Sequence, residues 1–457
     1  MTDLRTMPKA QHIERTGHTP RLHHEFSWVL MGQIAAGLGG LAGVKMLTRA
    51  MTPSAYGTFS LALTGTVLAQ QCIGGPLGQA AMRFYSASHE EGWTFNYLRA
   101  LNRLMIKGVA VLLAAAGLIV LACASAGQAK SVPVVTIALL LAIVTGYNIV
   151  LDAIQSGSRN RPVVALHQAA IQWLRPASAL ALLSLISSQM ASAVLGYVAA
   201  TVLVLASQAV FLSRQLSSSV SRNTVTPQQA ERQLLAYAWP FVTWGLLTWG
   251  QIVSDRWFLE LFRGASSVAA FTVCYQLGYY PVLLLTTAVS NLAGPIIFQI
   301  AGAGTESTRL TAALRANQKH ILALVVITLG AVVGCALFHS TIFRLLTTPA
   351  YAQYSVYLPV FAASAGAFSI AQAASLVFLI SARSNELTSV KCLPAVAGLM
   401  LNMFGAYFWG IPGAVAATFL FSLIYLAAVL RLTARAVPNS EAFPGLMRWP
   451  VKRASEG

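Results

Sequence analysis

Long uncharged apolar stretches recur along the whole chain, and they limit its fold more than any other feature of the sequence. A helix that crosses about 30 Å of hydrocarbon needs about 20 mostly apolar residues. Such stretches lie at residues 26–44, within 50–82, and at 108–128, 132–152, 162–184, 190–212, 234–256, 266–292, 321–343, 355–382, 391–409 and 412–431. Only 9% of the 457 residues are charged, against about a quarter in soluble domains. We therefore predict an all-α integral membrane protein of about twelve transmembrane helices.

The eighth stretch is ambiguous, because residues 264–305 are uncharged and long enough for two short spans, which Pro281 and Pro295 would kink or split. With one span there, 23 Lys and Arg residues fall on one side of the membrane and 6 on the other. Cytoplasmic loops are enriched in Lys and Arg. The bias therefore favours a single eighth span and places both termini in the cytoplasm.

The net charge of +17 is divided among short clusters between the apolar stretches. This pattern predicts contact with anionic membrane lipids and disfavours nucleic acid as a partner. One cluster, Arg99, Arg103 and Lys107, has four-residue spacing at the start of the third span, where it would gather an anionic lipid headgroup. The alternative is ordinary snorkelling of long basic side chains to the interface.

A weak internal repeat divides the chain into two halves. The segment LTRAMTPSAYGTFSLAL from Leu47 resembles LELFRGASSVAAFTVCY from Leu259 at an offset of 212 residues. Both segments follow an odd-numbered span, so the halves have the same orientation, as in transporters with parallel repeats. The predicted organisation is a cytoplasmic tail at 1–25, an N-lobe at 26–213, a cytoplasmic linker at 214–233, a C-lobe at 234–432 and a cytoplasmic tail at 433–457.

Arg175 is the clearest candidate for function, because ionisable residues inside a membrane are costly and usually face the interior of the bundle. Gln168 and Gln172 precede it at helical spacing and share its face. A guanidinium on such a face suits a phosphate or pyrophosphate through paired hydrogen bonds. The alternative is a structural arginine bonded to a carbonyl exposed near Pro176.

Opposite charges near the ends of two spans suggest an outer gate. Lys45 and Arg49 close the first span, while Asp255 and Glu260 flank the end of the seventh at nearly matching positions in the repeat. An ion pair between them would latch the two halves together; alternatively each charge lies among headgroups. We place all 13 acidic residues in tails, in loops or near span ends, so we expect no carboxylate in the middle of the membrane.

Aromatic and amide side chains in the seventh and eighth spans are a further candidate for substrate binding. Trp249, Tyr275 and Gln276 lie within these spans, and faces of this type stack against sugars. Ordinary helix packing explains them equally well. The sequence has no phosphate-binding GxxxxGK[ST] loop, no nucleophile with a nearby base and no cluster of metal ligands. We therefore expect neither an enzyme nor a cofactor.

Two segments resemble a known family. Residues 46–86 resemble the opening signature of bacterial polysaccharide flippases, which include O-antigen and exopolysaccharide transporters, and residues 408–425 are similar to the start of the last helix in that family. The matching residues are Tyr56, Gly57, Gly78, Arg83, Phe84, Gly413 and Ala414. Pro53 and Ser54 replace the acidic turn residues common in the family.

The resemblance implies the fold of the multidrug, oligosaccharidyl-lipid and polysaccharide exporters, with two six-helix lobes around a central cavity. It implies a polyprenyl-pyrophosphate-linked oligosaccharide as substrate, flipped across the bacterial inner membrane, with Arg83 among the substrate-binding candidates. Partners implied are a polysaccharide polymerase and glycosyltransferases. The alternatives are a multidrug cation antiporter, a lipid II flippase, or a membrane polysaccharide polymerase or ligase. An interior arginine without an interior acid favours an anionic substrate.

Overall fold

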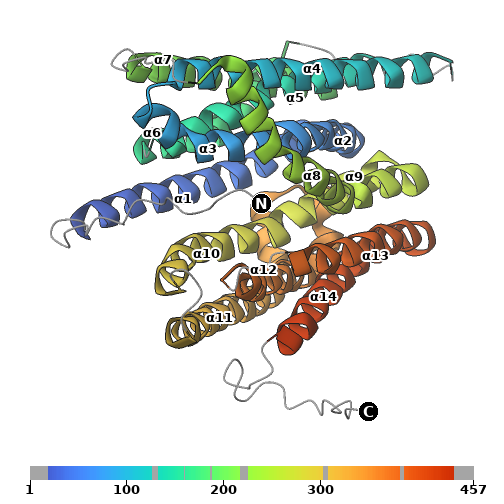
Figure 1. The fold of residues 1–457 in the computed structure, drawn as a ribbon. Helices are drawn as coiled ribbons and strands as arrows, with labels where there is room; N and C mark the ends of the chain where they lie inside the picture. Colours follow the sequence, from blue (N-terminus) through green and yellow to red (C-terminus); the bar gives the residue numbers. More distant parts are fainter. Residues whose placement is uncertain are drawn as a thin grey trace.

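The structure is a computed structural model that describes residues 19–125, 132–158, 160–185, 188–216, 225–301, 307–380 and 385–436. Within these ranges the chain is helical apart from short connections and contains no strand (Figure 1). The elements are α1 (Thr19–Ala50), α2 (Pro53–Ala69), η1 (Gln70–Gly74), α3 (Gly75–Glu90), α4 (Thr94–Ser125), α5 (Val132–Gly157), α6 (Arg161–Leu183), α7 (Gln189–Leu216), α8 (Pro227–Arg263), α9 (Ala265–Cys274), η3 (Tyr275–Tyr279), α10 (Tyr280–Ala301), α11 (Ser307–Leu346), η4 (Pro349–Tyr357), α12 (Leu358–Ile380), α13 (Asn385–Trp409) and α14 (Ile411–Ala436).

Two pairs of these helices form single long rods. The π-helical turn η1 joins α2 to α3, and η3 joins α9 to α10, without a break in the helix. In each rod a proline, Pro76 or Pro281, lies two residues after the π-helical turn, where the wider turn accommodates a residue that lacks an N–H group. The eighth span is therefore one continuous helix, and the described part of the chain forms the twelve predicted spans.

Nine of the twelve rods, within the described residues, are long and apolar enough to cross a membrane by length and composition alone. The other three are α2–η1–α3, α6 and α8. These three contain the polar groups on which the candidate site is built: Tyr56, Arg175 and the adjacent pair Asp255 and Arg256.

The rods are grouped in two lobes with α8 between them (Figure 1). The N-lobe is formed by α1 to α7 and the C-lobe by α9 to α14, while α8 packs against α3 and α4 of the first lobe and against α9 and α13 of the second. The predicted repeat agrees with this fold, because α2 and α9 begin 212 residues apart. Phe59 and Phe271, which the repeat aligns, are both buried in one shared core.

The predicted linker at 214–233 is partly helical. Thr226 and Gln229 form a capping box that starts α8 at Pro227, so residues 227–233 belong to the helix. Three small or apolar residues at four-residue spacing, Ala230, Leu234 and Ala238, pack into the N-lobe core. The first turns of α8 therefore belong with the N-lobe, although its sequence was predicted to open the C-lobe.

Helices also extend into both predicted terminal tails. Helix α1 begins at Thr19, inside the predicted tail at 1–25, and α14 continues to Ala436, beyond the predicted end of the C-lobe at 432. Residues 1–18 and 437–457 lie outside the described part of the chain. The helices extend past the apolar stretches because a helix continues into the interface until a residue or turn stops it.

The two lobes meet closely where α2 crosses α9. A Cβ atom at Gly57 would lie 1.8 Å from the carbonyl oxygen of Ala265, so the contact requires glycine at this position. A second close approach joins α13 to α14, where a Cβ atom at Gly413 would lie 2.0 Å from the carbonyl oxygen of Gly405. Two glycines of the resemblance, Gly57 and Gly413, are thus explained by backbone contacts between helices.

Candidate functional site

Arg175 lies in α6 and is held by neutral groups of neighbouring helices. Its Nε donates to the Thr201 hydroxyl of α7 at 3.1 Å and its Nη2 to the Thr145 hydroxyl of α5 at 3.2 Å. Its Cζ lies 5.7 Å from the centroid of the Tyr197 ring. No carboxylate among the described residues forms an ion pair with it. The bond to a carbonyl near Pro176, proposed as the alternative, is absent from these contacts.

The two glutamines that precede Arg175 have different surroundings. Gln168 donates to Asp152 of α5 at 3.5 Å and accepts a bond from Gln33 of α1 at 3.5 Å. The backbone of Gln172 lies against Gly39 of α1. The face that was expected to form one polar stripe therefore divides, with Arg175 bound to threonines and Gln168 joined to a separate amide and carboxylate network.

Asp152 is an interior carboxylate that the sequence reasoning missed. It was taken as the end of the fourth span, but α5 continues to Gly157 and leaves its side chain only partly exposed. Gln208 of α7 donates to its Oδ1 at 2.6 Å, and Asn148 donates to the Gln208 amide oxygen at 2.9 Å. The run of polar residues Asn148, Asp152 and Gln155, at spacings of three and four, was the available signal.

A second buried arginine lies in α8. Arg256 is 8% exposed and Asp255 3% exposed, and their Nη1 and Oδ1 atoms are 3.1 Å apart. The Arg256 Cζ lies 4.8 Å from the centroid of the Tyr275 ring and 5.7 Å from that of Phe271. Asp255 was expected near the end of the seventh span, which the sequence placed at residue 256. Helix α8 continues to Arg263, so both residues lie two turns inside it.

The expected latch between the charged residues of the gate is not formed in this structure. Asp255 pairs with Arg256, and among the described residues neither Lys45 nor Arg49 forms an ion pair. Arg49 is exposed and Lys45 partly buried. The Glu260 Oε2 is buried without a hydrogen-bond partner among the described residues.

A row of aromatic rings connects the two arginines across the contact between the lobes. From Arg175, the Tyr197 ring packs edge-on against Phe59 with centroids 5.1 Å apart, and Phe59 lies 6.0 Å from Tyr56. The Tyr56 hydroxyl then donates to the Gln276 amide oxygen of η3 at 2.9 Å. Tyr275, next to Gln276, completes the row beside the second arginine.

The predicted aromatic candidates are thus partly brought together. Tyr275 stacks on Tyr279 with ring centroids 4.5 Å apart. The two residues lie one turn apart on the same face of the helix, within the π-helical turn η3. Trp249 of α8 donates its indole N–H to the Thr64 carbonyl of α2 at 3.0 Å. Trp249 therefore joins α8 to α2, and its N–H already has a partner.

The basic residues near the ends of α3 and α4 lie apart from this interior row. Arg83, Arg99 and Arg103 are exposed, and the Arg99 guanidinium lies 5.3 Å from the centroid of the Phe95 ring. Lys107, one turn further along α4, forms an ion pair with Glu231 of α8. These residues form a peripheral basic surface and do not contact Arg175 or Arg256.

Comparison with known proteins identifies the family. The family described as "Polysaccharide biosynthesis protein" matches residues 22–301. The chain belongs to this family. No curated protein sequence matches the chain, but several solved structures share its fold.

Three of these structures show the likeness in fold. The lipid II flippase MurJ has a TM-score of 0.64 and 14% identity, over 89% of this chain and 87% of its own. A MATE transporter from Vibrio cholerae has a TM-score of 0.61 and 16% identity, over 93% and 98%. A MOP superfamily transporter from Pyrococcus furiosus has a TM-score of 0.60 and 15% identity, over 92% and 99%. The protein is therefore a multi-pass membrane protein with the twelve-helix fold of MOP superfamily transporters.

Proposed function

We propose that the protein is a flippase that moves polyprenyl-pyrophosphate-linked oligosaccharide across the bacterial inner membrane by alternating access, for surface or exopolysaccharide synthesis. Membership of the polysaccharide biosynthesis family supports the class of substrate, and the shared fold with MurJ and the MATE transporters supports the class of mechanism. Both termini lie in the cytoplasm in this proposal, as the distribution of Lys and Arg indicates.

The observation on which the proposal depends is the neutral environment of Arg175. A partly buried guanidinium inside a span without a carboxylate is costly, and the two threonine hydroxyls that Arg175 bonds do not neutralise its charge. A pyrophosphate would neutralise that charge and accept paired hydrogen bonds from the guanidinium. Arg175 is thus the proposed binding group for the pyrophosphate.

The remaining candidates have supporting roles in the proposal. The exposed residues Arg83, Arg99 and Arg103 attract the anionic headgroup at the cytoplasmic surface. Tyr275 and Gln276, on the C-lobe side of the aromatic row, contact the sugar.

Opening of the outer gate separates α2 from α9, which are packed in this structure at Gly57 and Ala265. This separation breaks the bond between Tyr56 and Gln276 and brings the interior charges into contact with water.

The experiment is complementation of a strain that lacks this chain. Arg175→Ala is expected to abolish surface polysaccharide and to leave lipid-linked repeat units on the cytoplasmic leaflet, while the variant protein remains in the membrane. Thr433→Val, a buried threonine of α14 that bonds only its own helix, serves as the matched control with normal export. Normal export from the Arg175→Ala strain would refute the assignment.

Two alternative functions on the same fold can be tested in further strains that express this chain. A multidrug cation antiporter would need an interior carboxylate that is available to a cation, whereas Asp255 is paired with Arg256 and Asp152 accepts bonds from two glutamines. Dye efflux conferred by the chain would favour the antiporter. Rescue of a strain depleted of lipid II flippase would favour a peptidoglycan precursor, which also contains a pyrophosphate.

A further inference from the structure

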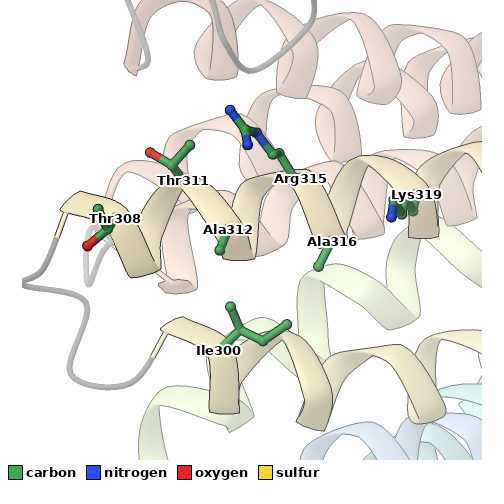
Figure 2. A pocket seen from close by; sticks show the side chains of 7 residues that line it. All are labelled: Ile300, Thr308, Thr311, Ala312, Arg315, Ala316 and Lys319. Carbon is green, nitrogen blue, oxygen red and sulfur yellow. The ribbon is translucent and has the colours of Figure 1, made fainter.

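A cavity of about 580 Å³ lies between α10 and α11, away from the interior row of aromatic residues. Its lining consists of Ile300 from α10 and six residues of α11: Thr308, Thr311, Ala312, Arg315, Ala316 and Lys319. Figure 2 shows Ala312 and Ala316 pointing toward Ile300 in the gap between the helices, while Arg315 and Thr311 extend from the far side of α11 and Lys319 lies one turn further along that helix. The cavity thus combines an apolar floor, two threonine hydroxyls and two cations.

The two cations begin a stripe that continues along α11. Arg315 and Lys319 are one turn apart, and an exposed apolar residue follows every three or four positions on the same face. These residues are Leu322, Val326, Leu329, Val333 and Leu337, each between 56% and 71% exposed. The opposite face of α11 packs against α12, so this stripe faces outward from the protein.

The length of the stripe matches the membrane. From Lys319 to Leu337 the helix rises about 27 Å at 1.5 Å per residue, close to the roughly 30 Å of the hydrocarbon core. With the apolar stripe against lipid tails, Arg315 and Lys319 lie at the level of the lipid phosphates. The cavity is therefore open to the headgroup layer and is continuous with a surface that fits an acyl chain.

We propose that this cavity binds the phosphate headgroup of an anionic phospholipid, with one acyl chain along the α11 stripe. Lys319 and Arg315 pair with the phosphate, and the Thr308 and Thr311 hydroxyls bond the headgroup oxygens. Basic pockets between transmembrane helices are a known form of anionic lipid site. The site is separate from Arg175 and does not depend on which substrate the protein transports.

Native mass spectrometry of the full chain in detergent tests the proposal, with phosphatidylglycerol and phosphatidylcholine offered in equal amounts. We expect the wild-type protein to retain phosphatidylglycerol selectively. Each basic side chain near a membrane surface contributes roughly fivefold in affinity, so Arg315→Gln with Lys319→Gln should weaken retention about 25-fold. Arg344→Gln, which removes an exposed cation at the other end of the same helix, should leave retention unchanged.

A second variant keeps the test valid if the double variant fails to fold. Ala312→Phe fills the cavity from an exposed position and preserves both charges, and it should also release phosphatidylglycerol. Equal retention by wild type and Ala312→Phe would overturn the proposal. Displacement of the lipid by millimolar inorganic phosphate, or one-for-one by undecaprenyl pyrophosphate, would also overturn it, since the site would then bind a free anion or the transported substrate.

Discussion

Arg175 is partly buried and Arg256 is buried, and each lies beside a tyrosine ring in one half of the aromatic row, yet only Arg256 has a carboxylate partner. Arg256 is paired with Asp255 next to it in α8, so the pair is neutral as a unit. Arg175 bonds only hydroxyls and contacts an aromatic face. Within the described residues, the positive charge of Arg175 in the N-lobe therefore has no carboxylate counter-ion.

The difference separates a structural cation from a binding cation. A buried ion pair fixes geometry, and removing one partner is costly because the other charge is left uncompensated. A buried cation that bonds only hydroxyls has already lost its hydration, so an anion that reaches it gains a strong charge-assisted bond. We therefore expect mutations at Arg256 to reduce stability and mutations at Arg175 to reduce transport.

The largest expected effect is on transport at Arg175. Arg175→Gln should lower the rate of flipping by about 100-fold or more, because hydrogen bonds to charged groups are each worth about 1.5–3 kcal/mol. Arg175→Lys should retain part of the rate, since the charge remains but the paired bonds are lost. The measurement is the accumulation of lipid-linked repeat units over time in strains that express each variant.

The control for this prediction is stability. The thermal midpoint of Arg175→Gln in detergent should equal or exceed that of the wild type, because the variant no longer buries a charge. A large fall in the midpoint would mean that Arg175 is structural and would remove the contrast with Arg256.

The second effect is on stability at the ion pair. Asp255→Asn should destabilise the protein by about 3–5 kcal/mol, because Arg256 is then buried without a counter-charge. The double variant Asp255→Asn with Arg256→Gln should recover most of that loss. Chemical unfolding of the two single variants and the double variant gives the coupling energy between the two residues. Additive losses in the double variant would contradict the pairing.

The sequence was sufficient for most of the fold, because hydrophobic periodicity and charge bias are properties of each segment by itself. The number of spans and the single eighth span followed from them, and the two halves followed from the repeat that begins at Leu47 and Leu259. The start of α8 at Pro227 was missed, because the whole polar stretch at 214–233 was taken as a linker. Thr226 and Gln229 within this stretch form a capping box. A capping box consists of two residues, so it is harder to recognise in a sequence than a polar stretch of twenty residues.

The site was harder to predict because its contacts join residues that are distant in the sequence. Arg175 was found from its position inside a span, but its partners Thr145 and Thr201 come from two other helices. Arg256 is the last residue of the seventh apolar stretch, so the sequence placed it at the end of a span. Only packing reveals that α8 continues and buries it. Exposed charges such as Arg99 were weaker candidates in the sequence, because snorkelling to the interface also explains them.

The third effect concerns the contact of α2 with α9, which lies between the two arginines. Gly57→Ala should destabilise this packed state by about 1–3 kcal/mol, because its new methyl group overlaps the Ala265 carbonyl. Gly65→Ala in the same helix meets no atom within 4 Å, so it should stabilise by up to about 1 kcal/mol through helix propensity. Thermal unfolding compares the two variants, and similar changes in both would show that the lobes are not held together at Gly57.

The smallest effect tests how Arg175 is held. Thr201→Val removes one of its two hydroxyl partners and should weaken substrate affinity about fivefold, the value of roughly one hydrogen bond, without lowering the amount of folded protein. Thr433→Val is the matched control, because both threonines are almost fully buried and donate to a carbonyl four residues earlier, but only Thr201 also accepts a bond from an arginine. The apparent Michaelis constant for flipping in proteoliposomes distinguishes them. If both valine variants raise it equally, the effect comes from the loss of a buried hydroxyl in general, and the orientation of Arg175 is set by Thr145 and Tyr197 alone.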